Sequence, residues 1–503
     1  MLRVLIALAL AIPLYELLRW QVLGRARAAL LRNARGYAAR HGVRVDLFKF
    51  GGKQLVREEL LNDRTVARAM AAAAEAGERP TDVRERVEQY IDEIVPAFSI
   101  SAYFELGMRL ARAAIGAVYR PVIAVPPPRL PENATAVFLI NHRSNFDYVV
   151  VGWALARQVA ISYAVGEWAR IFPLDALFKA FGGFFVRRGF PDPLYHTVLR
   201  RYLQLITRRG VTQGIFPEGG LTRDGALRPP KVGLLDSLLQ LAEDCELYFV
   251  PVGINYDRVL EDEVLLAELR GRDKPPTRGE KLRGTLRLLW ILPWRIAVNA
   301  ARVAAGRLQR HGYVAVAFGE PVRFRDLPHS GDMARLPDEQ RRARAKEIAA
   351  LLMERIARCI PATPVALVAR AAIDLSCDAS RSELVARVAE LRARLEELGV
   401  PLAMGREFDP QRRARAELRD DLARTRDLAR LEGEMLAGEE AEEIARLGLE
   451  RLVRRRALGL AGGRVARGAH PHARDLLAYY ARSLAALERP GAQALAARVG
   501  AAP

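Results

Sequence analysis

The chain has 503 residues with 78 Lys or Arg against 59 Asp or Glu, a formal net charge of +19, and its length favours two or three folding units. Because half of the residues are hydrophobic and 27% are charged, the composition excludes a wholly disordered chain and a polytopic transporter. The basic excess predicts an anionic partner, which is nucleic acid, a phosphorylated substrate or the anionic surface of a membrane.

The N-terminus begins with an apolar run from Val4 to Tyr15, which continues through Leu18 to the interfacial pair Arg19-Trp20. Twelve helical residues rise about 18 Å, which is short of a hydrocarbon core of about 30 Å. No A-x-A-like site follows the run, so a cleaved signal peptide is not expected. The run is predicted to be a short membrane anchor or an interfacial helix, with a buried amphipathic helix as the alternative. A second stretch, LLWILPWRIAV at 288–298, is typical of surface insertion.

The chain then divides by its hydrophobic period. Residues 22–95 are rich in Arg, Ala and Glu and predict helices, and helical, apolar sequence continues to Val125, before the breaker Pro126-Pro127-Pro128. Between Thr135 and Pro321, short β-rich runs alternate with helical stretches such as 193–209 and 234–245, which predicts an α/β fold with a mostly parallel sheet. The predicted strands are 135–141, 161–166, 184–188, 211–216, 247–256 and 313–319.

Strand-forming runs are not found after about Ile348, where Arg, Glu, Leu and Ala form segments with i, i+4 charge pairs typical of surface helices. Three regions are therefore predicted. They are an N-terminal membrane-associated helical region at 1–95, an α/β domain at 96–347 and a C-terminal helical domain at 348–503.

The cysteines Cys245, Cys359 and Cys377 show no paired spacing, which excludes a disulfide scaffold and a Cys-based zinc site and suits a reducing compartment. The seven histidines are too scattered for a metal cluster. Neither a metal nor a cofactor is expected.

Polar residues gather where the predicted strands end, which in open α/β sheets is the edge where ligands bind. The first group is NHRSNFD, with His142 directly after a strand and Asp147 five residues later. The two side chains would point about 140° apart on one helix, so they meet only if the chain turns between them, as a loop capped by Ser144 or Asn145 allows. An Asp that holds one imidazole nitrogen leaves the other free as a base. The alternative is a helix-capping Asp beside an unrelated surface His.

The second group is GGFFVRRG, in which Arg187 and Arg188 stand at a strand end between glycines. Two guanidinium groups there can offer forked donors to a phosphate. The alternative is a solvated strand terminus.

The third group is FPEGGLTR, followed by PPKVG. Gly219 and Gly220 let backbone N–H groups approach a ligand closely. Glu218 is predicted to order the loop or to bind a substrate hydroxyl, and Arg223 and Lys231 are predicted to bind phosphate. The alternative is an ordinary βα turn. The fourth group, VPVGINY, predicts an edge strand or a bulge because of its proline, or else a plain core strand.

In this order and spacing the four groups resemble the four sequence blocks of the glycerolipid acyltransferases, strongly over residues 95–325. The chain is most similar to the bacterial and mitochondrial glycerol-3-phosphate acyltransferases, from which it departs by Leu221, where this branch usually has Arg, and by Asn145. Further points of resemblance are NHRS-x-x-DY, FFVRR, Glu268–Gly271, Phe318–Pro321 and Leu476–Ser483.

The resemblance implies transfer of an acyl group from acyl-CoA or acyl carrier protein to the sn-1 hydroxyl of glycerol 3-phosphate, giving lysophosphatidate in phospholipid biosynthesis. It implies that His142 is the base and Asp147 its partner. Glu218, Gly219 and Gly220 would line the substrate site, with the phosphate held by Arg187, Arg188, Arg223 and Lys231. Alternative acceptors are lysophosphatidate (1-acylglycerol 3-phosphate) and dihydroxyacetone phosphate.

A different class would be a basic nucleic-acid-binding or scaffold protein. The sequence has no zinc finger, RNP-like aromatic motif or helix-turn-helix signature, so nucleic acid is not an expected partner. We expect the chain at the cell membrane, peripherally or through a single N-terminal anchor, with its catalytic domain in the cytoplasm.

Overall fold

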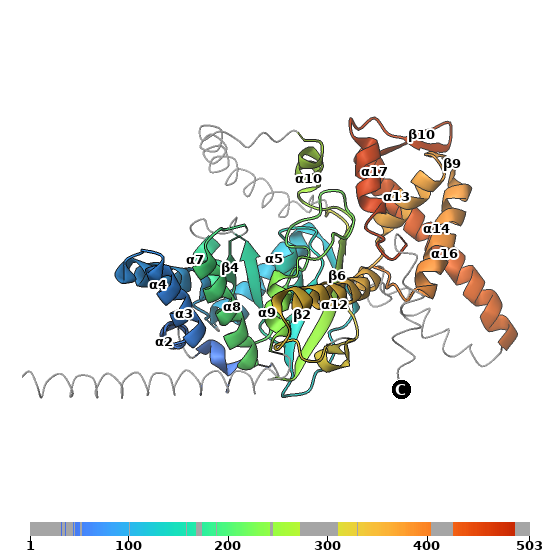
Figure 1. Ribbon diagram of the computed structural model, residues 1–503. Coiled ribbons are helices and arrows are strands. Elements are labelled where there is room, and N and C mark those ends of the chain that lie inside the picture. The colour runs from blue at the N-terminus through green and yellow to red at the C-terminus, as the bar shows by residue number, and fades with distance from the viewer. Residues whose placement is uncertain are drawn as a thin grey trace, which may run out of the picture.

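The architecture is taken from a computed structural model of the chain (Figure 1). The structure describes residues 53–99, 101–156, 158–166, 174–187, 189–241, 245–271, 310–328, 330–403 and 426–487, with a few positions between 32 and 50. The apolar runs at 4–18 and 288–298, and Arg188, lie outside the described residues.

A sheet of eight strands lies at the centre of the described chain, in the order β1-β7-β6-β2-β5-β3-β4, with β8 paired to β6. Strands β2 to β6 run parallel to one another, β7 and β8 are antiparallel to β6, and β1 is parallel to β7. The predicted α/β class with a mostly parallel sheet is confirmed. The bounds are β1 Arg120–Val125, β2 Thr135–Ile140, β3 Ser162–Gly166, β4 Phe184–Val186, β5 Gln213–Ile215, β6 Leu247–Tyr256, β7 Tyr313–Phe318 and β8 Val322–Arg323.

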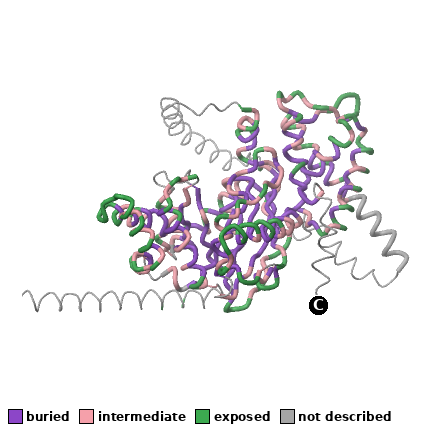
Figure 2. The backbone as a smooth tube through the Cα atoms, viewed as in Figure 1, coloured by how far each residue is buried: buried purple, intermediate pink, exposed green. Residues whose placement is uncertain are grey.

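Helices cover both faces of the sheet, which is why every residue of β2 is buried. On one face of β2, Ala136, Phe138 and Ile140 pack into a core with three helices, the first set named below. On the other face, Val137 and Leu139 pack into a second core with two helices, the second set. Figure 2 shows that the buried residues concentrate in this central region. The first set is α5 (Met108–Val118), α6 (Asp147–Leu155) and α13 (Pro364–Asp374), and the second is α9 (Gly233–Leu239) and α12 (Asp338–Cys359).

Strand β6 is an inner strand, which confirms the predicted core strand and excludes the edge strand that Pro251 also suggested. On one side β6 pairs with β2 along its length, with Leu139 opposite Pro251. On its other side it pairs with β8 at Tyr248 and Phe249 and with β7 only from Val252 onward. Pro251 lies where the partner changes, so its missing N–H breaks no ladder there.

The helices expected within residues 22–95 are present where the structure describes that region. Three helices pack against α8 and share a separate core, which includes Ile91, Ile94, Tyr195 and Val198. Within the described ranges, no helix combines the length and the apolarity needed to cross a bilayer. The bounds are α2 Lys53–Leu61, α3 Arg64–Glu75, α4 Pro80–Ile94 and α8 Pro193–Arg208.

Two predictions of helix are wrong. Helix was expected up to Val125, but Arg120–Val125 forms β1 because its backbone pairs with β7, nearly two hundred residues further along the chain. Strands were not expected after Ile348, but the C-terminal region has a three-stranded antiparallel sheet in the order β10-β11-β9. Gly462 and Gly463, with φ of 56° and 80°, make the two-residue hairpin turn between LGLA and RVAR.

The rest of the C-terminal region is helical. It comprises α14 (Arg381–Glu397), α16 (Arg426–Arg454) and α17 (Ala473–Ala481) beside α13, with β9 (Asp378–Ser380), β10 (Leu458–Ala461) and β11 (Arg464–Arg467). In Figure 1 these elements lie together on one side of the central sheet.

Candidate active site

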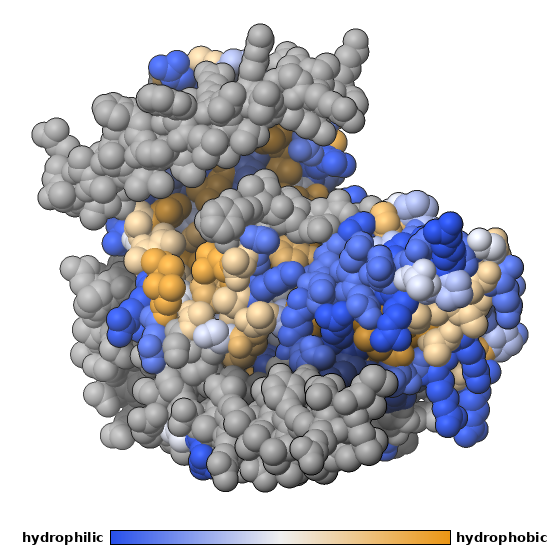
Figure 3. All heavy atoms as spheres, turned by 90° about the vertical axis from the view of Figure 1, so that its left-hand side faces the viewer, coloured by the Kyte–Doolittle hydropathy of each residue, from blue (hydrophilic) through white to orange (hydrophobic). Residues whose placement is uncertain are grey.

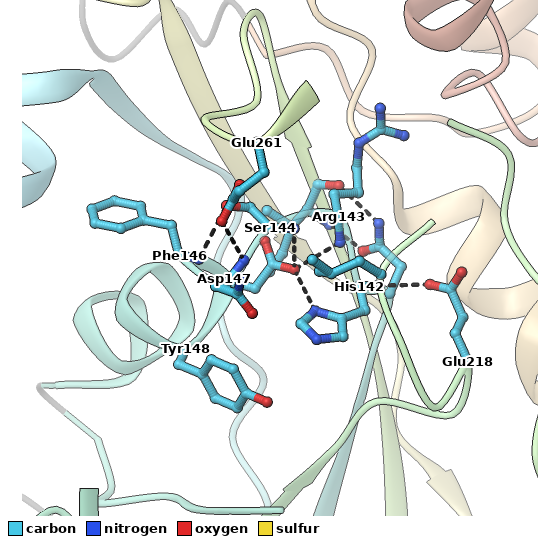
Figure 4. A network of polar contacts seen from close by, with 12 residues as sticks. His142, Arg143, Ser144, Phe146, Asp147, Tyr148, Glu218 and Glu261 are labelled. Carbon is cyan, nitrogen blue, oxygen red and sulfur yellow. Dashed lines mark hydrogen bonds and ion pairs between the residues drawn. The ribbon is translucent and has the colours of Figure 1, made fainter. Parts of the chain in front are cut away.

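His142 and Asp147 meet at the carboxyl edge of the sheet (Figure 4). Strand β2 ends at Ile140, and α6 begins at Asp147. The chain therefore turns between the two residues, and the imidazole Nδ1 of His142 lies 3.0 Å from Oδ2 of Asp147. Both side chains are buried, with exposed fractions of 2% and 0%. A helix-capping Asp beside an unrelated surface His is excluded.

The Asp147 carboxylate is held by three further donors. The backbone N–H groups of Arg143 and Ser144 donate to Oδ2 at 2.8 and 3.0 Å, and the hydroxyl of Tyr256 donates to Oδ1 at 2.6 Å. Burial, and next the charge of Asp147, raises the pKa of Tyr256 well above its usual value, so its hydroxyl remains a donor. These bonds fix the carboxylate that orients the imidazole.

The imidazole is also held by packing. Its ring lies 4.2 Å from the Phe216 ring, centre to centre, and meets the Tyr148 ring edge-on at 5.8 Å. With Nδ1 engaged by Asp147, Nε2 is the nitrogen that can act on a substrate. The site has the form of a general base and its orienting carboxylate.

Glu218 joins the third sequence block to the first. Its buried carboxylate accepts the backbone N–H of His142 at 2.6 Å and that of Arg228 at 2.8 Å. Burial raises the pKa of Glu218 to about 7. In addition, the N–H of Thr222 donates to the carbonyl of His142 at 3.1 Å. Of the two roles predicted for Glu218, these contacts match the ordering of the loop.

Gly219 has a left-handed φ of 64°, and a Cβ there would lie 2.6 Å from Cδ of Lys231. Lys231 therefore packs directly over the glycine, with its backbone N–H donating to the carbonyl of Pro217 at 2.8 Å. Gly220 is buried beside it.

Two of the predicted phosphate ligands, Arg187 and Arg223, already have carboxylate partners in this structure. Arg187 donates from Nε to Glu93 at 2.8 Å and from Nη2 to the same carboxylate, and its guanidinium lies 4.5 Å from the centre of the Phe190 ring. Arg223 pairs with Glu268 at 2.7 Å and is half exposed. No hydrogen bond among the described residues joins Arg187, Arg223 or Lys231 to His142. The structure thus brings together His142, Asp147, Glu218 and the two glycines, with Lys231 packed over Gly219. Arg187 and Arg223 instead pair with Glu93 and Glu268.

Several residues that sequence reasoning missed fix the NHRSNFD loop, between β2 and α6, by hydrogen bonds. The Asn141 amide exchanges hydrogen bonds with both backbone groups of Ile254, at 2.7 and 3.0 Å. Glu261 accepts the Ser144 hydroxyl at 2.7 Å and the N–H of Asn145 at 3.1 Å. Glu261 directly precedes α10 (Asp262–Leu269), and no motif singles it out. Asn141 and Tyr256 stood inside recognised blocks, where position at a strand end was the available signal.

Arg143 is a second missed residue, and it connects the site to α17. It is 2% exposed, donates from Nη1 to the carbonyl of Gly225 at 2.9 Å, and lies 5.1 Å from the centre of the Tyr479 ring. Its Nε and Nη2 are buried without a hydrogen-bond partner among the described residues. A Cβ at Gly225 would lie 1.8 Å from the carbonyl oxygen of Tyr479, so α17 touches the loop after the third block directly.

Two further contacts tie the C-terminal region to β6 and to the segment that follows it. Asn255 donates to the Ser483 hydroxyl at 3.1 Å, and the N–H of Val259 donates to the Tyr480 hydroxyl at 3.1 Å. The late LLAYYARS stretch therefore packs against the first and fourth sequence blocks and against the loop after the third.

Residues 125–255 match the family model described as Acyltransferase, and residues 299–442 match the one described as Glycerol-3-phosphate acyltransferase C-terminal region. A glycerol-3-phosphate acyltransferase of Aeromonas hydrophila is 29% identical over 58% of this chain and 35% of its own length. One from Ectopseudomonas mendocina is 32% identical over 51% of this chain and 30% of its own. The chain thus spans about a third of the length of these curated relatives.

A solved structure of the 1-acyl-sn-glycerophosphate acyltransferase from Thermotoga maritima covers 60% of this chain and 95% of its own, at 14% identity. Its TM-score is 0.28, which is too low to carry an argument. The two family models and the curated relatives agree with the geometry of the His142 site: residues 125–255 are similar to the acyltransferases, and residues 299–442 to the C-terminal region of the glycerol-3-phosphate acyltransferases.

Proposed function

We propose that the chain is a membrane-associated acyltransferase that transfers a fatty acyl group from a thioester donor to the sn-1 hydroxyl of glycerol 3-phosphate, giving lysophosphatidate. The observation that carries this proposal is the buried pair of His142 and Asp147, with Nδ1 engaged and Nε2 left for the substrate. The names of the curated relatives and the family model over 299–442 support the choice of acceptor.

In the proposed reaction, Nε2 of His142 takes the proton from the acceptor hydroxyl as its oxygen attacks the thioester carbonyl. The C–O ester bond forms, the C–S bond breaks, and the proton passes to the leaving thiolate. Asp147 stabilises the imidazolium that forms in between. The acceptor alcohol is itself the nucleophile, so no acyl-enzyme is required.

Backbone N–H groups near Gly219 and Gly220 would stabilise the oxyanion of the thioester carbon. The phosphate would be bound by Arg187, Arg188, Arg223 and Lys231. To do so it would have to displace Glu93 from Arg187 and Glu268 from Arg223, or share these arginines with the two carboxylates. A dianionic phosphate is a stronger partner for a guanidinium fork than a single carboxylate.

The membrane surface is the third element of the proposal. Large apolar side chains are exposed on elements that border the site. They are Leu106 in the helical turn Ser101–Gly107, Leu110 at the start of α5, and Val264 and Leu269 on α10. Figure 3 shows hydrophobic side chains gathered on one part of the molecular face beside an extensive hydrophilic surface. Such a face, with the net charge of +19, suits an anionic bilayer.

An acceptor screen on the purified chain tests the proposal. Glycerol 3-phosphate, lysophosphatidate and dihydroxyacetone phosphate are each offered with an acyl-CoA and with an acyl carrier protein thioester, and products are identified by mass. Glycerol 3-phosphate should give lysophosphatidate. A product from lysophosphatidate alone would overturn the proposed acceptor and point to Leu221, which stands where this branch usually has Arg.

A further inference from the structure

A cavity lies in the C-terminal region, and none of the site residues described above lines it. It has a volume of about 610 Å³ and is bounded by the end of α13, by β11 and by α17, elements that lie together in Figure 1. This volume is within the range of about 300–1,000 Å³ that is usual for small-ligand sites. Four of its lining residues are Arg370, Arg467, Arg474 and Arg482.

The cavity is strongly basic. Arg467 and Arg474 are exposed, and among the described residues no carboxylate lies within ion-pair distance of either. Asp374 is the acidic lining residue, and its carboxylate is already engaged by two arginines, Arg370 at 2.9 Å and Arg387 at 2.7 Å. The cavity therefore offers guanidinium donors that protein carboxylates do not satisfy.

Its base is apolar. Leu477, Ala478 and Ala481 line it from α17, while Arg474 and Arg482 stand four residues before and after Ala478, on the same helical face. The other face of α17 carries Tyr479 toward Gly225 in the acyltransferase domain. One helix thus has one face on the site loops and another on the cavity.

A chain of polar contacts leads from the cavity to His142. Arg482 pairs with Asp224 at 3.2 Å. Asp224 accepts the N–H of Ala226 at 3.1 Å, and the carbonyl of Ala226 accepts the Thr222 hydroxyl at 2.7 Å, with Asp224 3.2 Å from the same hydroxyl. The N–H of Thr222 donates to the carbonyl of His142 at 3.1 Å. An anion that draws Arg482 away from Asp224 would act on the loop that contacts the base.

We infer that this cavity binds a ligand with clustered phosphate groups, held by Arg467, Arg474 and Arg482, with an apolar or planar portion against the α17 base. Forked guanidinium donors match phosphate oxygens in pairs, and a concave apolar base suits a ring or a methylene chain. Two sources carry this chemistry. One is the nucleotide end of coenzyme A, which rests on the proposed acyl transfer, and the other is a group of neighbouring headgroups in an anionic phospholipid surface, each with one phosphate.

The test uses the full chain and the double variant Arg467→Ala/Arg474→Ala. Both side chains are exposed, so the variant should keep the thermal midpoint of the parent. Binding of coenzyme A without an acyl group is measured by calorimetry, and binding to phosphatidylglycerol vesicles by sedimentation. Loss of two charge-assisted contacts should weaken the binding in one arm by about tenfold or more. The matched control is Arg446→Ala, an exposed α16 arginine outside the cavity, which should leave both arms unchanged.

If the double variant binds coenzyme A more weakly than the parent does, the ligand is the nucleotide. If it binds the vesicles more weakly, the ligand is the group of neighbouring phospholipid headgroups. Unchanged binding in both arms overturns the inference, as does loss of transfer from acyl carrier protein alone, because the arginines would then dock an acidic protein. The inference and the proposed function fail separately. His142→Ala should lose acyl transfer but keep binding at the cavity, and a parent chain that binds the phosphate ligand but acylates no acceptor would overturn only the proposed function.

Discussion

At the scale of single residues, the site is built by hydrogen bonds that converge on one carboxylate. Asp147 is the first residue of α6 and accepts four donors, of which the imidazole of His142 is one. A carboxylate buried in this way remains favourable only because its lone pairs are satisfied. The orientation of the base is therefore determined by neighbours on β2, α6 and β6 together.

His142→Ala tests the base directly. Removal of a general base should reduce thiol release from the acyl donor by about 10²–10⁴-fold, while the thermal midpoint changes little because the Asp147 cage of N–H donors persists. The rate is followed with a thiol reagent, and folding by circular dichroism. Full activity in the variant would remove His142 from the mechanism.

Tyr256→Phe tests the positioning of Asp147. The variant deletes the hydroxyl that donates to Oδ1 at 2.6 Å, and a hydrogen bond to a charged group contributes about 1.5–3 kcal/mol. We expect kcat to fall about tenfold or more, with the KM for the acceptor unchanged. The control is Tyr163→Phe, whose buried hydroxyl has no partner among the described residues. Equal effects of the two variants would mean that Tyr256 contributes packing alone.

Glu218 predicts a pH dependence of stability. Burial raises its pKa in the folded chain to about 7, above an unfolded value of about 4.3. Between these two values the folded chain binds more protons than the unfolded chain, so this contribution to stability is full at low pH and is lost as pH rises through 7.

The advantage of the parent over Glu218→Gln in free energy of unfolding should therefore shrink from pH 5 to pH 8, by up to about 3 kcal/mol. Urea titrations of both proteins at the two pH values measure it. A constant difference would show that the Glu218 carboxyl has an ordinary pKa.

At the scale of elements, α17 packs between the loops of the site and the other elements of the C-terminal region. Tyr480 donates to Asp262, and Arg455 on the other side of the same carboxylate donates to it at 3.1 Å. Tyr479 stacks under Arg143 and touches Gly225. These contacts couple the loop after the third block to an element more than 250 residues later in the chain.

Gly225→Ala tests this contact. The new methyl would lie 1.8 Å from the Tyr479 carbonyl at a φ of 84°, so α17 has to move away from the loop. We expect a stability loss of about 3 kcal/mol or more and reduced activity. Gly210→Ala is the control that separates backbone strain from a steric clash. Gly210 also has a left-handed φ, of 71°, but there is open space around its Cβ position. That control should lose only about 1–2 kcal/mol. Equal losses of stability in the two variants would show that the contact between Gly225 and α17 contributes nothing beyond backbone strain.

At the scale of the whole molecule, the net charge of +19 has specific and general parts. A few arginines belong to the proposed phosphate site and to the C-terminal cavity. Many others form ion pairs on the described helices, such as Arg387 with Asp374 and Arg446 with Glu443. Exposed pairs of this kind contribute little to stability, so the unpaired excess is what an anionic surface would meet.

Vesicle binding by the whole chain should therefore depend on salt. Binding to vesicles that contain phosphatidylglycerol should weaken as ionic strength rises from 0.01 to 0.5 M, because the Debye length falls from about 30 Å to a few ångströms. Pure phosphatidylcholine vesicles are the control, and sedimentation measures both. Binding that is independent of salt and of headgroup would mean that apolar insertion dominates.

The sequence alone determined the α/β class, the strands β2 to β7 within a few residues, and the pair His142 and Asp147. These features depend on local patterns, namely short β-rich runs between helical stretches and polar residues directly after strand ends, which parallel pairing brings to one edge. The hairpin at Gly462-Gly463 was also visible in principle, but the surrounding Arg-rich helices concealed it.

Only the tertiary structure decided the remaining features. The strand β1 and the roles of Tyr256 and Glu261 depend on contacts between segments more than one hundred residues apart. The inner position of β6 and the role of Arg143 also depend on distant segments, among them Gly225, 82 residues from Arg143. The pairing of Arg187 with Glu93, 94 residues away, is likewise a contact between distant segments. Such contacts leave no periodic trace in the sequence, because a backbone pairing or a buried hydrogen bond constrains a distant partner rather than its neighbours along the chain.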